Sequence, residues 1–279
     1  MNHSIFSVIL PAHQEEHHIL NCLNALCSQD LVPDVRHEVI VVANGCTDAT
    51  AQLARGCAAD FAAAGWDFQV LETPVGNKIN ALNMGDEAAA GDIRLYLDAD
   101  IVVGPGMVTA LYQTLNGSGA RYAGARLVVP QPVSRISAAY ARFWQRLPFV
   151  RTGVTGAGLF AVNAEGRARW SRFPDIISDD GFARLNFAPH ERQRVDVPYL
   201  WPITEGFRPL VRVRRRQDAG NAELARRFPA LFKNVDGDRP PMKQALRLGM
   251  IDPTGFLAYA AVALGVRIGP PSQGWDRNR

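Results

Sequence analysis

The first hundred residues alternate between strand-like runs and helical patterns, and no other feature of the sequence constrains the fold as strongly. Four apolar runs, at 6–11, 37–44, 67–72 and 93–100, are separated by segments whose apolar residues recur with helical spacing. Strands that alternate with helices predict right-handed βαβ units, and therefore an α/β fold with a mostly parallel sheet and helices on both faces. Ligands of such sheets bind beyond the carboxyl ends of the strands.

The helical patterns continue into a less regular second half. Thr47 is the predicted N-cap of a helix that ends near Cys57. The other predictions are helices at 15–29, 77–90, 107–116, 140–147, 178–187 and 207–228 and strands at 125–130, 154–163 and 192–200. Because no linker or repeat interrupts the chain, we expect one domain in two halves, residues 1–104 and 105–230, followed by a C-terminal helical extension at 231–279.

The composition argues against several classes of protein. A net charge of +3 gives no reason to expect a nucleic-acid partner. The four cysteines form no CxxC or His/Cys zinc pattern, so we expect reduced thiols. The start has no signal-peptide pattern, and the apolar run at 256–266 is shorter than the ~20 residues of a spanning helix. We expect a soluble, cytoplasmic protein; the alternative adds peripheral contact with the inner face of the membrane through this late run.

Two carboxylates, Asp98 and Asp100, stand one residue apart at the end of the run 93–100. If the strand continues through them, both project to the same side. Neighbouring carboxylates raise each other's pKa unless a cation joins them. A hard ion such as Mg²⁺ or Mn²⁺ takes one or two carboxylates and completes its shell with phosphate oxygens. The triplet therefore indicates a metal site for a phosphate-bearing ligand, with solvated strand-end acids as the alternative.

Four segments, SVILPAHQEE, VIVVANGCTDAT, GNKINALN and YLDAD, resemble in order and spacing the N-terminal half of family 2 glycosyltransferases with the GT-A fold. The resemblance is close over about 1–105 and looser over 150–220. It implies a nucleoside-diphosphate-sugar donor, with UDP or GDP as the expected carrier, and Mn²⁺ or Mg²⁺ held at Asp98 and Asp100. The donor contacts that it implies are Pro11, Ala12, His13, Glu15, Asn44, Lys78, Asp98 and Ala99.

The sequence departs from the family pattern in the donor half. Ala43 and Asn44 replace an acidic pair that contacts the base or ribose, and His13 replaces a tyrosine. His13 can still stack on a ligand, or it is a solvated loop residue. Lys78 lies near a predicted helix start, where a cation opposes the helix dipole. Bound phosphate would explain that lysine; an exposed surface lysine is the alternative.

Asp179 and Asp180, in SDDGFARL, match the family's acidic pair on the acceptor side. The resemblance implies that Asp180 is the general base that deprotonates the acceptor hydroxyl in inverting transfer. A helix capped by Ser178, with acids favoured in its first turn, is the structural alternative.

Five arginines gather within nine residues of the late basic helix: Arg208, Arg212, Arg214, Arg215 and Arg216. The resemblance is to a Q-x-x-R-W segment that closes over the diphosphate, although no tryptophan follows here. Because arginine pairs with phosphate in bidentate fashion, Arg215 and Arg216 are the predicted donor contacts. A solvated basic face, or attraction to anionic lipid or nucleic acid, remains open.

Together these features predict a metal-dependent inverting glycosyltransferase. Its acceptor would be a glycan, a lipid-linked molecule or a small metabolite. Two other functions remain open. One is a sugar nucleotidyltransferase, although the glycine-rich loop typical of that class is missing after the first strand. The other is a catalytically inactive sugar-nucleotide binder or lipid-surface adaptor.

Overall fold

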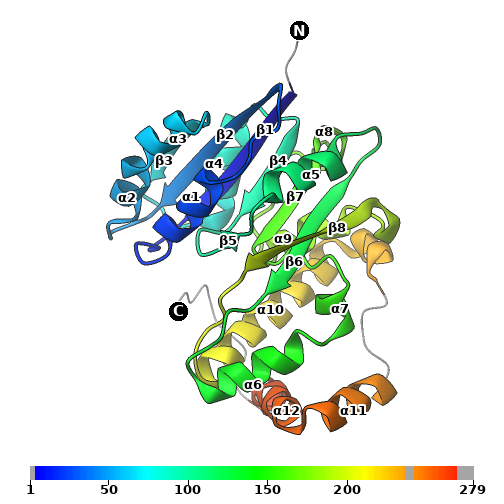
Figure 1. Ribbon diagram of the computed structural model, residues 1–279. Coiled ribbons are helices and arrows are strands. Elements are labelled where there is room, and N and C mark those ends of the chain that lie inside the picture. Colours follow the sequence, from blue (N-terminus) through cyan, green and yellow to red (C-terminus); the bar gives the residue numbers. More distant parts are fainter. Residues whose placement is uncertain (1–3, 237–241, 269–279) are drawn as a thin grey trace.

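The computed structural model describes residues 4–236 and 242–268, and a mixed sheet runs through its centre (Figure 1). The strands of this described part are β1 (Ser4–Ala12), β2 (Val35–Asn44), β3 (Asp67–Thr73), β4 (Ile93–Leu97), β5 (Val102–Val103), β6 (Tyr122–Val128), β7 (Leu159–Asn163) and β8 (Arg192–Leu200). Their order in the sheet is β3-β2-β1-β4-β7-β6-β8-β5.

The strand direction changes in the middle of the sheet. β3, β2, β1 and β4 are parallel neighbours, as the alternation of strands and helices predicts. β7 runs antiparallel to both β4 and β6, and β6 then pairs with β8 in parallel. The parallel half therefore presents four strand ends at one edge, and the second half completes the same sheet from the other side.

Helices cover both faces of the sheet. The described helices are α1 (Ile19–Cys27), α2 (Thr50–Gly56), α3 (Ala58–Ala63), α4 (Lys78–Ala88), α5 (Met107–Leu115), α6 (Arg135–Trp144), α7 (Pro148–Arg151), α8 (Ala164–Arg167), α9 (Asp179–Leu185), α10 (Phe207–Arg227), α11 (Met242–Ile251) and α12 (Pro253–Ile268), with 3-10 turns at Pro189–Glu191 and Pro229–Asn234. α1 and α5 pack on one face and α4 and α9 on the other.

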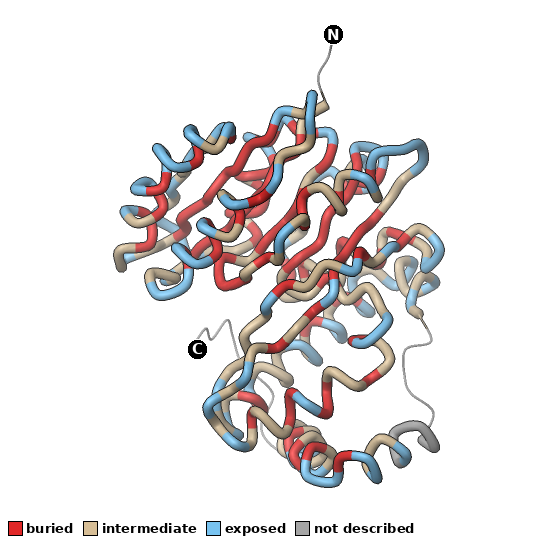
Figure 2. Tube along the Cα trace, in the orientation of Figure 1, coloured by how far each residue is buried: buried red, intermediate tan, exposed pale blue. Residues whose placement is uncertain are grey.

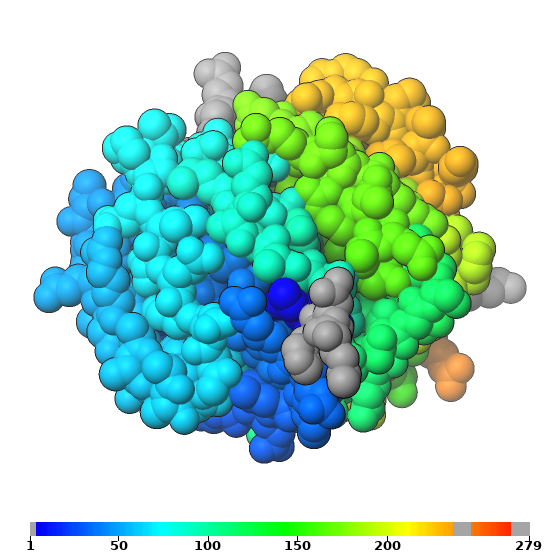
Figure 3. Space-filling model, turned by 90° about the horizontal axis from the view of Figure 1, so that it is seen from above, coloured from blue at the N-terminus to red at the C-terminus, as the bar shows by residue number. Residues whose placement is uncertain are grey.

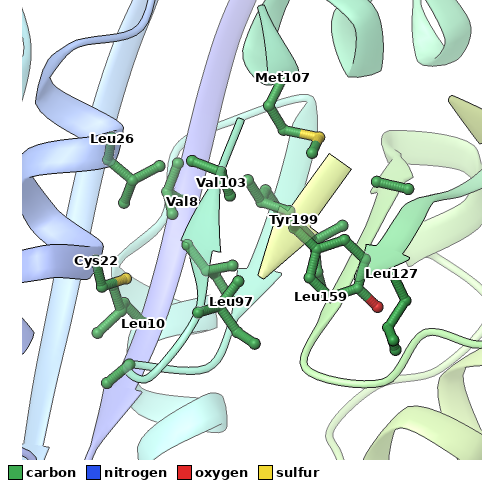
Figure 4. Packing of buried hydrophobic residues seen from close by; sticks show 14 of the residues in the cluster. Val8, Leu10, Cys22, Leu26, Leu97, Val103, Met107, Leu127, Leu159 and Tyr199 are labelled. Carbon is green, nitrogen blue, oxygen red and sulfur yellow. The ribbon is translucent and has the colours of Figure 1, made fainter. Parts of the chain in front are cut away.

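β1 is buried on both faces, which explains its continuous apolar sequence. Val8 and Leu10 point into the core shared with α1, beside Leu26 (Figure 4). Ile9 points the opposite way and packs with Leu82 of α4. Burial along the central strands is nearly continuous, and exposed residues concentrate on the outer helices and loops (Figure 2).

Several predicted boundaries are wrong. The predicted strand at 154–163 begins only at Leu159, as β7, and the predicted helix at 140–147 is α6, Arg135–Trp144. β4 ends at Leu97, so the segment 98–100 is a turn and not part of the strand. α2 begins at Thr50 with Ala49 at the N-cap position, and Thr47 is not its cap. The backbone N–H of Thr50 instead donates to Asp48 Oδ1 at 3.1 Å.

A buried ion network ties α4 to β4. The carboxylate of Asp86, on α4, accepts hydrogen bonds from Arg94 at 2.5 Å, from Tyr96 at 2.7 Å and from Arg167 of α8 at 2.7 Å. Burial by itself would raise the pKa of Asp86, but the hydrogen bonds from Arg167 and Tyr96 outweigh it and lower the pKa. The network fixes the helix that begins at Lys78 against the strand that leads into Asp98.

The C-terminal helices belong to the second half of the molecule. α12 packs against α6, where the rings of Tyr140 and Tyr259 stack with centroids 5.6 Å apart. Arg142 of α6 donates to Asp252, between α11 and α12, at 2.8 and 2.9 Å. Residues 237–241 and 269–279 of the predicted extension lie outside the described residues. None of the described helices combines the length and the apolar character needed to span a membrane.

The two predicted halves lie side by side in space, the first blue to cyan and the second green to orange in Figure 3. The sheet crosses the predicted boundary near residue 104 because β4 pairs with β7. The edge where the parallel strands end therefore meets residues of the second half.

Candidate functional site

A cavity of about 590 Å³ opens where β1 and β4 end, and both halves of the chain line it. The first half contributes Pro11, Lys78 and Asp98, and the second contributes Asp179 and Asp180. The cavity therefore lies where the sequence places the ligand, beyond the carboxyl ends of parallel strands.

Lys78 joins the two halves. Its Nζ lies 2.8 Å from Asp98 Oδ1 and 3.1 Å from Asp179 Oδ2, and its side chain is only 22% exposed. Burial by itself would lower the pKa of Lys78, but the charges of Asp179 and Asp98 outweigh it and raise the pKa above its usual value. The side chain is a paired cation at the start of α4, and the alternative of an exposed surface lysine does not hold.

Asp179 and Asp180 open α9, and their environments differ. Asp179 is 7% exposed and contacts Lys78. Asp180 accepts hydrogen bonds from the Gly181 N–H at 2.7 Å and from the Ser178 hydroxyl at 3.1 Å. Ser178 occupies the N-cap position, but its side chain makes no capping hydrogen bond, so the predicted capping by its hydroxyl is wrong.

Asp180 is set up to exchange a proton near neutral pH. Burial and the neighbouring charge of Asp179 raise the pKa of Asp180 to about 6, while Lys78 and the two hydrogen-bond donors act in the opposite direction. An acid with that pKa is ionised at neutral pH and remains basic enough to accept a proton, as general bases require.

Asp98 and Asp100 have separate surroundings because they lie in a turn. Asp98 lines the cavity, its side chain is 30% exposed, and its backbone N–H donates to the Gly158 carbonyl at 2.9 Å. Asp100 is only 6% exposed. Asp98 and Asp100 therefore do not share one face of a strand, and that prediction is wrong.

The cavity gathers charges of both signs, as a metal shared with a phosphate ligand requires. The carboxylates of Asp98, Asp179 and Asp180 meet the ammonium group of Lys78, and the same cavity is also lined by Asp218, Arg184, Arg214 and Arg216. Within 4–236 and 242–268, no group of three or more His, Cys, Asp or Glu side chains is arranged to hold a metal alone. Mg²⁺ characteristically takes one or two carboxylates and completes its shell with phosphates and water, so two aspartates of the 98–100 turn suffice for that role.

The loops after β1 and β2 are locked together. Gln14 has a left-handed backbone, with φ 56°, and its Oε1 accepts from the Thr47 N–H at 2.8 Å. Nδ1 of His13 lies 2.5 Å from the Asn44 carbonyl, and the Asn44 amide donates to the Ala12 carbonyl at 2.7 Å. These contacts compensate the strain at Gln14 and fix the predicted donor loops relative to each other.

A glycine is required where the second loop meets the third. Gly45 has φ +58°, and a Cβ there would lie 2.4 Å from the backbone N of Gly76. A Cβ on Gly76 would in turn lie 2.9 Å from the His13 ring. The loops that follow β2 and β3 therefore pack backbone to backbone, and the His13 ring, from the loop after β1, packs against Gly76.

The predicted donor contacts divide into those that line the main cavity and those that do not. Pro11, Lys78, Asp98 and Arg216 line it. His13 and Glu15 are half-buried, and the Glu15 N–H donates to Thr50. Ala12, Asn44 and Ala99 are buried and do not line it.

The two arginines of α10 that were predicted to contact the donor, Arg215 and Arg216, have different surroundings. Arg216 lines the main cavity and also a neighbouring one of about 690 Å³, between the start of α4 and α10. The two cavities share Lys78, Asp179 and Arg216 as a common wall. Arg215 instead donates to the carbonyls of Gly265 and Val266 in α12, at 2.5 and 3.2 Å, and it lines neither cavity. Its side chain holds helices together.

Several cavity residues escaped the sequence analysis, mainly aromatic ones: Tyr96, Trp144, Phe149, Phe160 and Trp201. Trp144 has the helical spacing of a core residue, and nothing in its pattern indicates a site. Trp201 directly follows β8, at a strand end in the second half of the chain, where the sequence pattern is less regular. Residues 155–158, in the glycine-rich segment VTGAG, also line the cavity.

Comparison with known proteins decides the family. The model of the glycosyl transferase family 2 matches residues 7–169, more than half of the chain. The chain belongs to glycosyltransferase family 2. A glycosyltransferase, AglE of Haloferax volcanii, is 32% identical over 127 residues; the match spans 45% of this chain and only 40% of that relative.

Solved structures share the fold of this family 2 chain. The mannosyltransferase PcManGT from Pyrobaculum calidifontis, in complex with GDP-Man and Mn²⁺, superposes with a TM-score of 0.58 at 20% identity, over 95% of this chain and 76% of the other. Glucosyl-3-phosphoglycerate synthase from Mycobacterium tuberculosis superposes with a TM-score of 0.53 at 22% identity, over 85% of this chain and 82% of the other. The S. aureus protein TarS in complex with UDP superposes with a TM-score of 0.53 at 14% identity, over 94% of this chain and 89% of the other. The expected GT-A fold is confirmed.

The raised pKa of Asp180 predicts a stabilising substitution. Folding raises this pKa from an ordinary value near 4, so ionising Asp180 opposes folding at every pH above that range, fully above about pH 6. Asp180→Asn removes the charge and keeps an acceptor oxygen, so we expect a higher Tm at about pH 7.5. The gain should vanish below about pH 4, where the wild-type carboxyl is protonated in both states.

Differential scanning fluorimetry across this pH range measures the shift. Asp179→Asn is the matched control, because it removes a partner of Lys78 and should lower Tm at neutral pH. A lower Tm for Asp180→Asn at pH 7.5 would show that Asp180 is a structural partner.

Proposed function

We propose that the protein is a metal-dependent inverting glycosyltransferase, moving a sugar from a UDP- or GDP-linked donor to an acceptor hydroxyl. The observation that carries the proposal is the joining of the predicted donor residues Lys78 and Asp98 to the acidic pair Asp179 and Asp180 in one cavity. A binder of sugar nucleotides has no use for a second acidic pair beside the phosphate site.

The donor would lie over the three locked loops, with its diphosphate at the wall shared by the two cavities. Lys78 and Arg216 would contact the phosphates there, and Asp98 and Asp100 would hold Mn²⁺ or Mg²⁺. The bound metal supplies Lewis-acid stabilisation of the departing diphosphate. Lys78 is held in place before the donor arrives, so little reorganisation is needed when negative charge develops.

Asp180 would act as the general base. The proton of the acceptor hydroxyl moves to its carboxylate as the hydroxyl oxygen bonds to the anomeric carbon. The bond from that carbon to the diphosphate oxygen breaks on the opposite face, so the configuration inverts. The 590 Å³ of the cavity is enough to hold the reacting sugar beside an acceptor group.

The metal-binding role of Asp98 gives the direct test. Purified protein is offered UDP- and GDP-sugars with Mn²⁺, Mg²⁺ or EDTA, and donor binding is followed by thermal shift. We expect a metal-dependent rise in Tm with one donor class. Asp98→Asn should reduce metal-dependent donor binding at least about tenfold. The control is Asp196→Asn, at an exposed acid in the middle of β8 that does not line the cavity, and it should leave donor binding unchanged.

Three outcomes separate the proposal from its alternatives. Donor binding unaffected by EDTA would exclude the metal mechanism. Binding with neither donor hydrolysis nor transfer under any metal would favour an inactive binder. Formation of a nucleotide sugar from a sugar phosphate and a nucleoside triphosphate would indicate a nucleotidyltransferase.

The role of Asp180 predicts a pH profile. Because the base must be ionised, the transfer rate should be level above about pH 7 and fall roughly tenfold per unit below about pH 5. Asp180→Asn should lower kcat by about 10²- to 10⁴-fold and keep the donor affinity within a few fold. A profile that is flat down to pH 4, or loss of donor binding in this variant, would contradict the assignment.

We further propose a cytoplasmic enzyme that also works at a membrane through the surface of α12. Leu257, Leu264 and Ile268 share one helical face and are 65%, 57% and 76% exposed. Arg267, beside Ile268, and Arg247, in the middle of α11, are exposed as well. Exposed apolar residues together with cations match an anionic lipid surface, which fits a lipid-linked acceptor among those predicted.

Vesicle sedimentation tests this membrane contact. The protein should sediment with vesicles that contain anionic lipid and much less with neutral ones. The double variant Leu257→Gln/Leu264→Gln should lose this binding, whereas Leu20→Gln, an exposed site on α1, should keep it. Equal sedimentation of the double variant would refute the role of α12.

A further inference from the structure

The cavity has an aromatic wall that the proposed donor contacts and the acidic pair leave unused. Trp144 of α6, Phe149 of α7 and Trp201 after β8 all line it. The two indole rings stack with centroids 5.4 Å apart and 28° between their planes, and Phe149 meets Trp144 edge-on at 6.1 Å. Trp144 is 9% exposed, whereas Trp201 and Phe149 are only half-buried.

Trp201 is held next to Gly158, which also lines the cavity. Its backbone N–H donates to the Val128 carbonyl at 2.9 Å. A Cβ on Gly158 would lie 3.0 Å from Trp201 Cδ1, so the indole rests directly on that backbone, which has φ +68°. The Gly158 carbonyl in turn accepts from the Asp98 N–H at 2.9 Å. Gly158 alone therefore links the Trp201 indole to Asp98 of the proposed donor site.

Trp201 differs from the other tryptophans of the described residues, including Trp144, which is a buried core residue. Trp66 and Trp170 are 3% and 7% exposed and lie within apolar clusters. Trp201 instead leaves part of a large apolar ring exposed in a cavity that polar side chains also line, among them Asp180, Gln217 and Asn221. Leaving that surface in water is unfavourable unless a ligand covers it.

The polar groups beside the rings match a sugar better than a lipid chain. Ser178, Asp180, Gln217 and Asn221 line the same cavity, and they offer hydrogen bonds that an acyl or isoprenyl chain could not use. Behind the indoles, a slot between α6 and α10 holds only about 40 Å³, room for about three water molecules and not for a lipid chain. A pyranose has an apolar C–H face and a rim of hydroxyls, which satisfies both kinds of wall.

We propose that Trp201, backed by Trp144, is the stacking platform for a pyranose ring of the acceptor. The acceptor is then a glycan, free or lipid-linked, whose hydroxyl reaches Asp180 while the ring lies on the indole. The inference rests on the proposed glycosyl transfer, because it assigns the second substrate of the same cavity.

The test compares the acceptor with the donor in three variants. Simple methyl glycosides and short oligosaccharides are the acceptor probes, and a sugar-free alkyl phosphate is the competing probe. For Trp201→Ala we expect the acceptor KM to rise at least tenfold, with donor hydrolysis in the absence of acceptor unchanged within twofold. Trp201→Phe keeps a stacking face and should recover most of the lost affinity. Trp170→Phe, in a separate core, should behave like the wild type.

Binding without catalysis gives an independent readout. Saccharides should quench the tryptophan fluorescence of the wild type without donor or metal, and this quenching should be lost in Trp201→Phe. An unchanged acceptor KM in Trp201→Ala, or transfer to the alkyl phosphate and to no glycoside, would overturn the platform. Saccharide quenching in a protein that neither binds nor hydrolyses any nucleotide sugar would leave the platform standing and refute the proposed transfer.

Discussion

The ion pairs of Lys78 with Asp98 and Asp179 are the interaction on which the site depends. The lysine begins α4, one aspartate follows β4, and the other begins α9 in the second half of the chain. A buried cation is costly unless it is paired, so the lysine draws the two halves to a common point. The network around Asp86 holds α4 and β4 in register behind it. The cavity forms where these elements meet.

Around Lys78, the carboxylates of Asp98, Asp179 and Asp180 lie close enough to repel one another, although Arg184, Arg214 and Arg216 line the same cavity. Burial, together with the charge of Asp179, raises the pKa of Asp180 to about 6. Such unfavourable charge is typical of functional sites, because the groups that bring it also perform the chemistry. A divalent cation with its phosphate ligand, and a proton arriving at Asp180, would each relieve part of it. The same repulsion thus links the proposed metal site to the proposed base.

Local sequence predicted the elements better than their ends. The strands of the parallel half, α4, α5, α9 and the long basic helix α10 lie where periodicity placed them. The errors at β4, Thr47 and Ser178 share a cause: at each place a side chain or backbone group finds a partner distant in sequence or outside the expected cap. Asp98 donates its N–H to Gly158, and Ser178 donates its hydroxyl to Asp180. Residue spacing carries no information about such partners.

The sequence by itself determined the α/β class, the edge of the sheet that carries the site, and the residue types gathered there. Alternating periodicity is local, and parallel strands necessarily end at one edge. Only the tertiary structure decided which side chains face the cavity. Arg215 and Arg216 are neighbours, yet one binds α12 and the other lines the site, since successive residues of a helix point about 100° apart. Trp144 and Trp201 meet only because α6 and the end of β8 pack together, a contact between residues far apart in the chain.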